Sequence, residues 1–190
     1  NIHDENLVIE ELEKKLIKSV KSQMLSDVPL GGFLSGGIDS SLITALMQRE
    51  NNRSIKTFTI GFNDKQFDES IFAKKVSNYL GTDHSEIIIS DKDSRNVIPL
   101  LPQIYDEPFA DSSQIPTYLI CKVAKQNVTV ALSGDGGDEL FGGYNRYTWS
   151  PKIWKKISIL PFFLRKKLGE LSLNISERNL DIILKSFINR

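Results

Sequence analysis

The segment Ser35-Gly36-Gly37-Ile38-Asp39-Ser40-Ser41 has the residue types and the spacing of a loop that binds phosphate groups. It follows a short apolar run and leads into a stretch with helical periodicity. Backbone N–H groups at a helix N-terminus bind oxyanions, and the helix dipole favours that binding. Gly36 and Gly37 let the backbone approach a phosphate closely, and the serine hydroxyls add donors. The segment therefore predicts a site for a nucleotide or for pyrophosphate.

Asp39 indicates that a cation accompanies this ligand. A carboxylate repels phosphates unless a cation lies between them, and magnesium accepts oxygen ligands from both groups. The segment lacks the lysine of a P-loop and the GxGxxG pattern of dinucleotide-binding folds. Its SGGxDS pattern resembles the pyrophosphate-binding loop of N-type ATP pyrophosphatases, which cleave ATP between the α and β phosphates. For Ser-Gly-Gly taken alone, a tight turn with a helix cap is the alternative interpretation.

A second glycine loop has the same context. The β-rich apolar run Thr129–Leu132 is followed by Ser133–Glu139, which contains two aspartates and one glutamate. Loops at the carboxyl ends of neighbouring parallel strands converge on one crevice. We therefore expect Asp39 and Asp138 to bind one magnesium–nucleotide from two sides. A calcium loop or an acidic solvated turn is the alternative, but the EF-hand pattern fails because Gly137 stands where the third oxygen ligand belongs.

Strands and helices that alternate along the chain must position these loops. The residue patterns predict strands over residues 29–35, 56–62, 85–89 and 128–132. They predict helices over residues 5–26, 38–49, 68–81 and 113–126, and one that begins at Asp91 or Asp93. Such βαβ units imply an α/β fold, with a parallel twisted sheet and helices on both of its faces.

Residues 149–190 differ from the rest because strand signals are absent and apolar residues alternate with Lys and Arg. We expect short helices, broken at Pro151 and Pro161. A surface for a membrane or a nucleic acid is one interpretation of this basic stretch. A partial helical subdomain is the favoured one. The predicted organisation is a leading helix at 1–28, an α/β core at 29–148 and this helical part.

Composition limits the functional classes. The chain has 190 residues, of which 40% are hydrophobic and 25% charged, enough for one ordinary core. Basic and acidic residues number 24 each, so no positive excess predicts a nucleic-acid partner. Cys121 is the only cysteine, which excludes an internal disulfide and fits a reducing cytoplasm. No apolar run has the length of a membrane span, and no signal peptide is visible. We expect a cytoplasmic protein without a membrane partner, and we interpret the first residue, Asn1, as a sign of a longer parent.

Four segments resemble, in the same order, the C-terminal synthetase domain of glutamine-hydrolysing asparagine synthetases. They are PLGGFLSGGIDSS at 29–41, FTIGF at 58–62, DEPFADSSQIP at 106–116 and SGDGGDELFGGY at 133–144. The resemblance covers roughly residues 10 to 150. β-Lactam synthetases and amidotransferases of bacterial surface-polysaccharide pathways share this domain. The resemblance implies an adenine nucleotide alpha hydrolase-like fold of the N-type ATP pyrophosphatase kind, followed by a truncated helical part. It also implies that a glutaminase domain and a distal C-terminal region are absent from the chain.

The implied activity is that of an AMP-forming carbon–nitrogen ligase of the asparagine synthase (glutamine-hydrolysing) type. ATP would adenylate the side-chain carboxylate of aspartate with release of pyrophosphate, and glutamine-derived ammonia would then give asparagine and AMP. The alternative is the same chemistry on another carboxylate, such as a sugar acid in surface-polysaccharide biosynthesis. A catalytically inert nucleotide-binding module is a third reading, but loss of Asp39 or Asp138 would be its sign and both are present. The implied cofactors are ATP and magnesium, and a homodimer is one assembly considered. The isolated fragment is expected to be inactive or weakly active.

The resemblance also assigns roles to individual residues. Asp135 stands near the acceptor as the catalytic candidate that orients the substrate or handles a proton, although an N-capping role explains it nearly as well. Phe33 and Ile60 lie at strand ends where the family holds adenine through backbone groups, and both would also serve the core. The predicted metal ligands are Asp39 and Asp138. The residues predicted to bind ATP or pyrophosphate are Phe33, Ser35, Gly36, Gly37, Asp39, Ser40, Ile60, Ser133 and Gly134.

Overall fold

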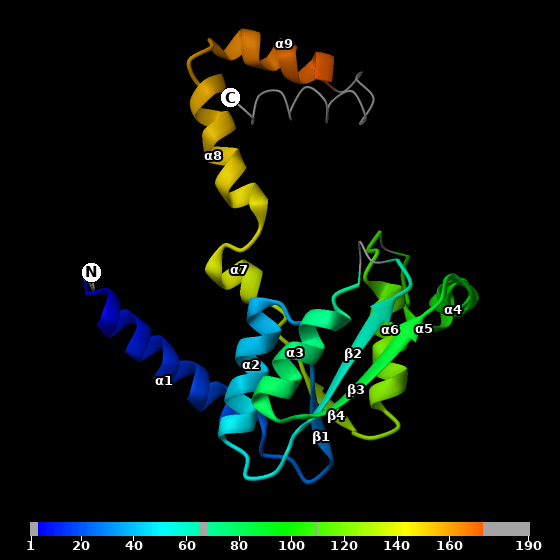
Figure 1. Ribbon diagram of the computed structural model, residues 1–190. Coiled ribbons are helices and arrows are strands. Elements are labelled where there is room, and N and C mark those ends of the chain that lie inside the picture. The colour runs from blue at the N-terminus through cyan, green and yellow to red at the C-terminus, as the bar shows by residue number, and fades with distance from the viewer. Residues whose placement is uncertain (1–3, 65–67, 109, 173–190) are drawn as a thin grey trace. The chain divides into compact units, whose positions relative to one another are not determined.

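The computed structural model describes residues 4–64, 68–108 and 110–172 (Figure 1). The chain forms two compact units, residues 1–137 and residues 138–190. The last part of the predicted helical region, residues 173–190, lies outside the described residues, as does Phe109 of the DEPFADSSQIP segment.

The first unit contains a sheet of four parallel strands, as the sequence predicts. The strands are β1 (Leu30–Phe33), β2 (Lys56–Phe62), β3 (Asp83–Ile89) and β4 (Val130–Leu132), in the order β3-β2-β1-β4. Gly32 of β1 pairs with Thr57 on one side and with Leu132 on the other. The chain moves outward from β1 to β3 and then returns across β1 to form β4. The strand order therefore reverses between β1 and β4, where ligands bind in open α/β sheets.

Helices cover both faces of the sheet (Figure 1). They are α1 (Glu5–Gln23), α2 (Ile38–Arg49), α3 (Ser70–Leu80), α4 (Asp91–Val97) and α6 (Gln114–Ala124). Helices α1 and α2 share a core cluster whose buried members are Val20, Leu46, Met47 and Ile55. The cluster at the end of α6 has Phe58, Ala124 and Val128 as its buried members.

The glycines of β1 allow both layers to approach closely. A Cβ atom on Gly31 would lie 2.9 Å from the Phe58 ring, and one on Gly32 would lie 3.2 Å from the sulfur of Met47. Because successive residues of a strand face opposite sides, each glycine makes room for one layer. The structure thus confirms the parallel sheet between helices that the sequence predicts.

Some element bounds agree with the sequence patterns, but α1 ends at Gln23, three residues earlier than predicted, and β1 covers only Leu30–Phe33 of the predicted residues 29–35. Helix α2 and strand β2 have the predicted bounds, and Gly81 ends α3 in the left-handed conformation at φ 72°. Strand β3 begins at Asp83, two residues earlier than predicted, because the Asp83 N–H donates to the Ile55 carbonyl at 2.9 Å. Strand β4 begins later than predicted because the Val128 N–H still bonds to the Ala124 carbonyl of the preceding helix, at 2.8 Å.

The helix starts follow local hydrogen bonding. Helix α4 begins at Asp91, after Ser90, whose hydroxyl accepts from the Asp93 N–H while the Asp93 carboxylate accepts from the Ser90 N–H. This reciprocal pair is a capping box. Helix α3 begins at Ser70 with Glu69 at the N-cap position, and the Asp68 carboxylate accepts from the Ser70 N–H at 3.1 Å. The short helices η1 (Ile98–Leu100) and α5 (Leu101–Ile104) follow α4.

A polar network joins β2, β3 and the end of α3. The Thr57 hydroxyl lies 2.9 Å from the Thr82 hydroxyl and 2.9 Å from Nδ1 of His84. Thr82 donates to the Ser77 hydroxyl at 2.9 Å, so Thr57 donates to Thr82 and Nδ1–H of His84 donates to Thr57. Nε2 of His84 is buried and has no hydrogen-bond partner among the described residues. Burial lowers the pKa of His84 below its ordinary value of 6.5.

The helices α8 (Asn145–Ile157) and α9 (Phe162–Ser172) lie in the second unit, and the short α7 (Gly137–Phe141) precedes them. The predicted break at Pro151 is wrong, because Pro151 lies inside α8. An interior proline removes one helical hydrogen bond and crowds the carbonyl four residues earlier, and α8 continues despite this cost. Helix α9 starts directly after Pro161, as expected. Within residues 4–64, 68–108 and 110–172, no helix combines the length and the apolar character that crossing a bilayer requires.

Candidate functional site

The Ser35–Ser41 loop connects β1 to α2 and is held by its own hydroxyl groups. The Ser40 hydroxyl accepts from the Ser35 N–H at 3.2 Å and lies 2.9 Å from the Ser35 hydroxyl. The Gly37 N–H donates to the Ser35 hydroxyl at 3.2 Å, and Ser40 donates to the Gly37 carbonyl at 3.3 Å. The Ser40 hydrogen therefore goes to Gly37, and the Ser35 hydroxyl donates to Ser40. These hydrogen bonds define the shape of the loop.

Gly36 fits this loop against helix α3. It has φ 84°, a conformation that side chains other than glycine rarely adopt. A Cβ atom at Gly36 would lie 2.6 Å from Cβ of Phe72 and 2.6 Å from the Ala73 nitrogen. Both the backbone conformation and the contact with α3 therefore require glycine at this position.

The N-terminus of α2 has the features of an anion site. Gly37 occupies the N-cap position, and no side chain caps the helix. The N–H groups of the first turn have no acceptor within the helix, and the dipole favours negative charge there. In this turn Asp39 and Ser40 are partly buried, and Ile38 is exposed. An oxyanion placed here would meet backbone N–H groups, with the Asp39 carboxylate beside it.

The loop after β4 lies directly against this helix N-terminus. A Cβ atom on Gly134 would lie 2.8 Å from the Ser40 nitrogen and 3.0 Å from Cβ of Asp39. One on Gly137 would lie 2.5 Å from Cγ of Asp39. A side chain on Gly134 would collide with the backbone of α2, and one on Gly137 would collide with the Asp39 carboxylate, so the two glycines permit this approach. Two loops about a hundred residues apart in sequence thus meet at the point where the strand order reverses.

Ser133 and Asp135 belong to this second loop. The Asp135 N–H donates to the Ser133 hydroxyl at 3.3 Å, and Asp135 itself is exposed. Gly136 has φ 89° and turns the chain toward Gly137. The structure thus brings Ser133, Gly134 and Asp135 to the edge of the sheet that carries the Ser35–Ser41 loop.

Asp138 follows Gly137 directly in the chain and is the first residue of the second unit. The Gly143 N–H donates to the Asp138 carbonyl at 3.0 Å. The Tyr144 hydroxyl donates to the Glu139 carboxylate at 2.5 Å, which lowers the pKa of Glu139 and raises the pKa of Tyr144. The guanidinium carbon of Arg146 lies 4.2 Å from the centre of the Tyr144 ring. These contacts fix the turn that carries Asp138.

Of the two residues predicted to hold adenine, Phe33 ends β1, whereas Ile60 lies two residues before the end of β2. Phe33 is the last residue of β1, is partly buried, and packs against the cluster of Phe58, Ala124 and Val128. Ile60 is partly buried in β2, opposite Ile87 of β3. Phe33 thus also serves the core, and the role of both residues in binding adenine stays a prediction.

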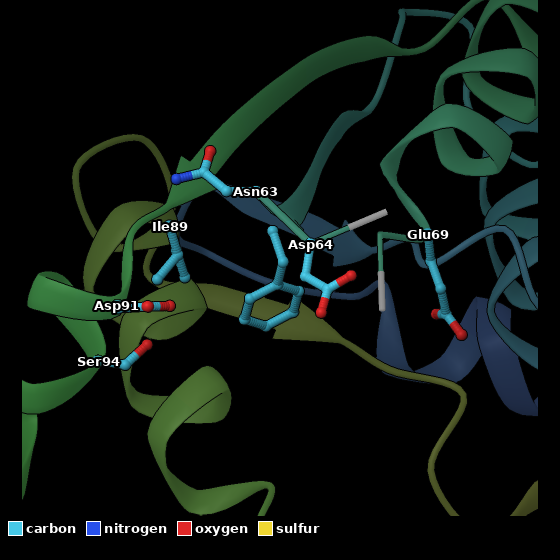
Figure 2. A pocket seen from close by; sticks show the side chains of 7 residues that line it. Asn63, Asp64, Glu69, Ile89, Asp91 and Ser94 are labelled. Carbon is cyan, nitrogen blue, oxygen red and sulfur yellow. The ribbon is translucent and has the colours of Figure 1, made fainter. Parts of the chain in front are cut away.

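A cavity of about 520 Å³ opens at the carboxyl ends of β2 and β3. Its residues come from those strand ends, the N-cap of α3 and helix α4 (Figure 2). They are Phe62, Asn63, Asp64, Glu69, Ile89, Asp91 and Ser94. An apolar wall with carboxylate and amide groups suits a ligand that has flat apolar parts and hydrogen-bond donors.

Sequence reasoning missed this cavity. Its signal is the place of Phe62, Asn63 and Asp64, which directly end β2, beside Ile89, which ends β3. No group of three or more His, Cys, Asp or Glu side chains suited to a metal ion occurs among residues 4–64, 68–108 and 110–172. Magnesium that travels with a nucleotide takes one or two carboxylates and completes its shell with phosphates and water.

The chain has clear relatives in sequence. The family model described as asparagine synthase matches residues 11–185. The chain is 44% identical over 165 residues to a protein named putative asparagine synthetase [glutamine-hydrolyzing] 2 of Methanocaldococcus jannaschii, with 86% of this chain and 32% of that protein covered. It is 42% identical over 165 residues to asparagine synthetase [glutamine-hydrolyzing] 1 of Bacillus subtilis, with 87% of this chain and 26% of that protein covered. The chain thus spans less than a third of the length of these curated relatives.

Solved structures share the fold. An NH3-dependent NAD synthetase from Campylobacter jejuni superposes with a TM-score of 0.50 at 16% identity, covering 72% of this chain and 60% of that one. At this identity the similarity concerns the fold alone. It agrees with the expected ATP pyrophosphatase architecture.

Proposed function

This chain belongs to the asparagine synthase family, and we propose that it forms the ATP-binding part of an AMP-forming carbon–nitrogen ligase. The observation that carries the proposal is the meeting of the two glycine loops at the uncapped N-terminus of α2. Cleavage of ATP between its α and β phosphates requires donors that stabilise the charge on departing pyrophosphate. In this proposal the donors are the first-turn N–H groups of α2 and the hydroxyl of Ser133, while the hydroxyls of Ser35 and Ser40, which donate within the loop, fix its shape.

Asp39 and Asp138 are the proposed ligands of magnesium. The space beside Gly137, which a side chain would fill, is occupied by the Asp39 carboxylate, and Asp138 is the next residue in the chain. Carboxylate oxygens are the hard donors that magnesium prefers. When bound, magnesium would neutralise charge on the phosphates during their departure. The chain's own task is to hold the two carboxylates where they meet the nucleotide.

The nucleoside of ATP is proposed to lie on the β2 side of the Ser35–Ser41 loop. The support is the place of Phe33 at the end of β1, and the cavity that begins at Phe62, two residues beyond Ile60 in β2. Its volume of about 520 Å³ falls within the usual range for small-molecule sites. Ribose hydroxyls and the adenine amino group are donors, so they suit the carboxylates of the cavity better than phosphates would.

The proposed chemistry has two steps. A carboxylate oxygen of the acceptor bonds to the α phosphorus, and pyrophosphate leaves. Ammonia then attacks the acyl carbon, loses a proton, and AMP leaves. Asp135, exposed beside Ser133, is the proposed group that orients the acceptor or accepts this proton.

Aspartate is the proposed acceptor, and glutamine the proposed source of ammonia. The support is the printed names of the relatives, which are glutamine-hydrolysing asparagine synthetases. These proposals concern the full-length protein, for which we also propose a cytoplasmic location. The α/β core at residues 29–148, including both loops, is the part proposed to bind ATP.

Calorimetry of magnesium–ATP binding to the full-length protein tests the site. Asp39→Asn and Asp138→Asn should each weaken binding, because each removes an anionic ligand. Asp83→Asn, an exposed position at the amino end of β3, is the matched control and should leave the affinity unchanged. Unchanged affinity in either of the first two variants would contradict the metal assignment.

The acceptor needs a separate test, the release of pyrophosphate with a panel of acids. Release with aspartate should exceed release with other acids. Equal release with a uronic acid would instead favour a sugar carboxylate as the acceptor.

A further inference from the structure

Two glycine pairs follow β4, namely Gly136-Gly137 and Gly142-Gly143. In each pair the backbone conformation requires glycine at the first position. Gly136 has φ 89° and Gly142 has φ 69°, so both stand in the left-handed region that favours glycine. Gly137 and Gly143 do not have positive φ. A left-handed backbone therefore does not account for these two glycines, and another cause is needed.

That cause is space for a carboxylate. A Cβ atom on Gly137 would lie 2.5 Å from both Cγ and Oδ2 of Asp39, and 2.9 Å from Oδ1. A Cβ atom on Gly143 would overlap Oδ1 of Asp138 and would lie 2.9 Å from its Cγ. The first contact lies within the first unit and the second within the second unit. In each case the nearest group is a carboxylate that the proposed function assigns to magnesium.

We propose that Gly137 and Gly143 are positioning residues, whose bare Cα atoms hold the carboxylates of Asp39 and Asp138 in their metal-binding orientations. This role rests on the proposed magnesium site. An alanine at Gly137 would force the Asp39 side chain to rotate about its Cα–Cβ bond, because the collision involves the end of that side chain. The rotation would turn the carboxylate away from its place beside the N-terminus of α2. An alanine at Gly143 would displace Asp138 in the same way.

The structure supplies matched controls in the same two pairs. A Cβ atom on Gly136 would meet no heavy atom within 4 Å, and one on Gly142 would make only an ordinary contact of 3.9 Å with Tyr147. Gly136→Ala and Gly142→Ala therefore strain the backbone but do not touch either carboxylate. Gly137→Ala and Gly143→Ala touch a carboxylate without that strain.

The first measurement is the dissociation constant of Mn²⁺ for the full-length protein in the presence of ATP, determined by electron paramagnetic resonance. Gly137→Ala and Gly143→Ala should raise the dissociation constant of Mn²⁺ about 10- to 100-fold, the range found when groups that orient a metal ligand are changed. Gly136→Ala and Gly142→Ala should have smaller effects on this constant, even where they lower stability more. Equal or larger losses of affinity in these controls would overturn the proposal.

The second measurement is a double-mutant cycle on stability, which needs no metal. Gly137→Ala should destabilise the protein that carries Asp39 but not the Asp39→Ala variant, in which the colliding carboxylate is gone. The same cycle applies to Gly143 and Asp138. Equal destabilisation in both backgrounds would overturn the contact. If the cycle shows coupling while the unaltered protein binds no Mn²⁺ with ATP, then the proposed magnesium site fails and the positioning role fails with it.

Discussion

Ser40→Ala should loosen the phosphate loop, and the structure indicates by how much. The Ser40 hydroxyl accepts from the Ser35 N–H and from the Ser35 hydroxyl, and it donates to the Gly37 carbonyl. That carbonyl keeps a second bond, from the Ser41 N–H at 3.1 Å. The variant therefore leaves two donors of Ser35 without their partner. Each such bond contributes about 0.5–1.5 kcal/mol, so the full loss would be about 1–3 kcal/mol. Because Ser35 and Ser40 are only partly buried, water can replace part of it, and we expect about 1–2 kcal/mol.

Urea denaturation of Ser35→Ala, Ser40→Ala and the double variant measures this effect. The two single changes remove one shared hydroxyl–hydroxyl bond, so their effects should overlap by about 0.5–1.5 kcal/mol. Ser41→Ala is the matched control, because the Ser41 hydroxyl oxygen is buried and has no hydrogen-bond partner among the described residues. That control should cost little or even stabilise. Additive effects of the two serines, within about 0.3 kcal/mol, would refute the shared network.

Three further outcomes follow from the structure. Burial lowers the pKa of His84, the nearby Lys74 lowers it further, and Glu86 acts in the opposite direction. The folded protein therefore binds fewer protons than the unfolded chain, so the free energy of unfolding should fall as the pH drops below about 6.5. His84→Gln should flatten this dependence on pH in urea titrations. An unchanged slope would contradict the buried neutral imidazole. Gly81→Ala should lower the free energy of unfolding by about 1–2 kcal/mol in denaturation experiments, because φ is 72° at this position. Gly81→Asn should lower it less, because asparagine tolerates the left-handed conformation better. Equal losses would contradict the strain argument. Pro151→Ala should increase the helix content measured by circular dichroism, because alanine restores the backbone hydrogen bond that proline lacks. This bond accounts for part of the roughly 3 kcal/mol that an interior proline costs. No increase would indicate that α8 is not continuous.

Local patterns were sufficient to predict much of the fold. The bounds of α2 and β2 follow from apolar periodicity between strong turn signals, and the left-handed end of α3 follows from Gly81. The parallel sheet follows from strict alternation of strands and helices. The meeting of the two glycine loops was expected from the rule for loops at the carboxyl ends of parallel strands, and the contacts of Gly134 and Gly137 agree with it.

Other features depend on information that no local pattern contains. Pro151 predicts a break, but α8 continues through it, and no local pattern around Pro151 indicates this. The spatial role of Gly137 depends on Asp39, which lies about a hundred residues earlier, so the glycine alone reads only as part of a flexible loop. The cavity at the ends of β2 and β3 needs residues from two strands and two helices, none of which has an unusual sequence context.

The most direct test of the account is the transfer of ¹⁸O from the acceptor to AMP. The full-length protein would be given ATP, a source of ammonia and aspartate labelled in its side-chain carboxylate, and the AMP would be analysed by mass spectrometry. Attack of the carboxylate on the α phosphate predicts one ¹⁸O atom in each AMP formed with asparagine. Asparagine formed together with unlabelled AMP, or with ADP and labelled phosphate, would contradict cleavage of ATP at the loops of Asp39 and Asp138.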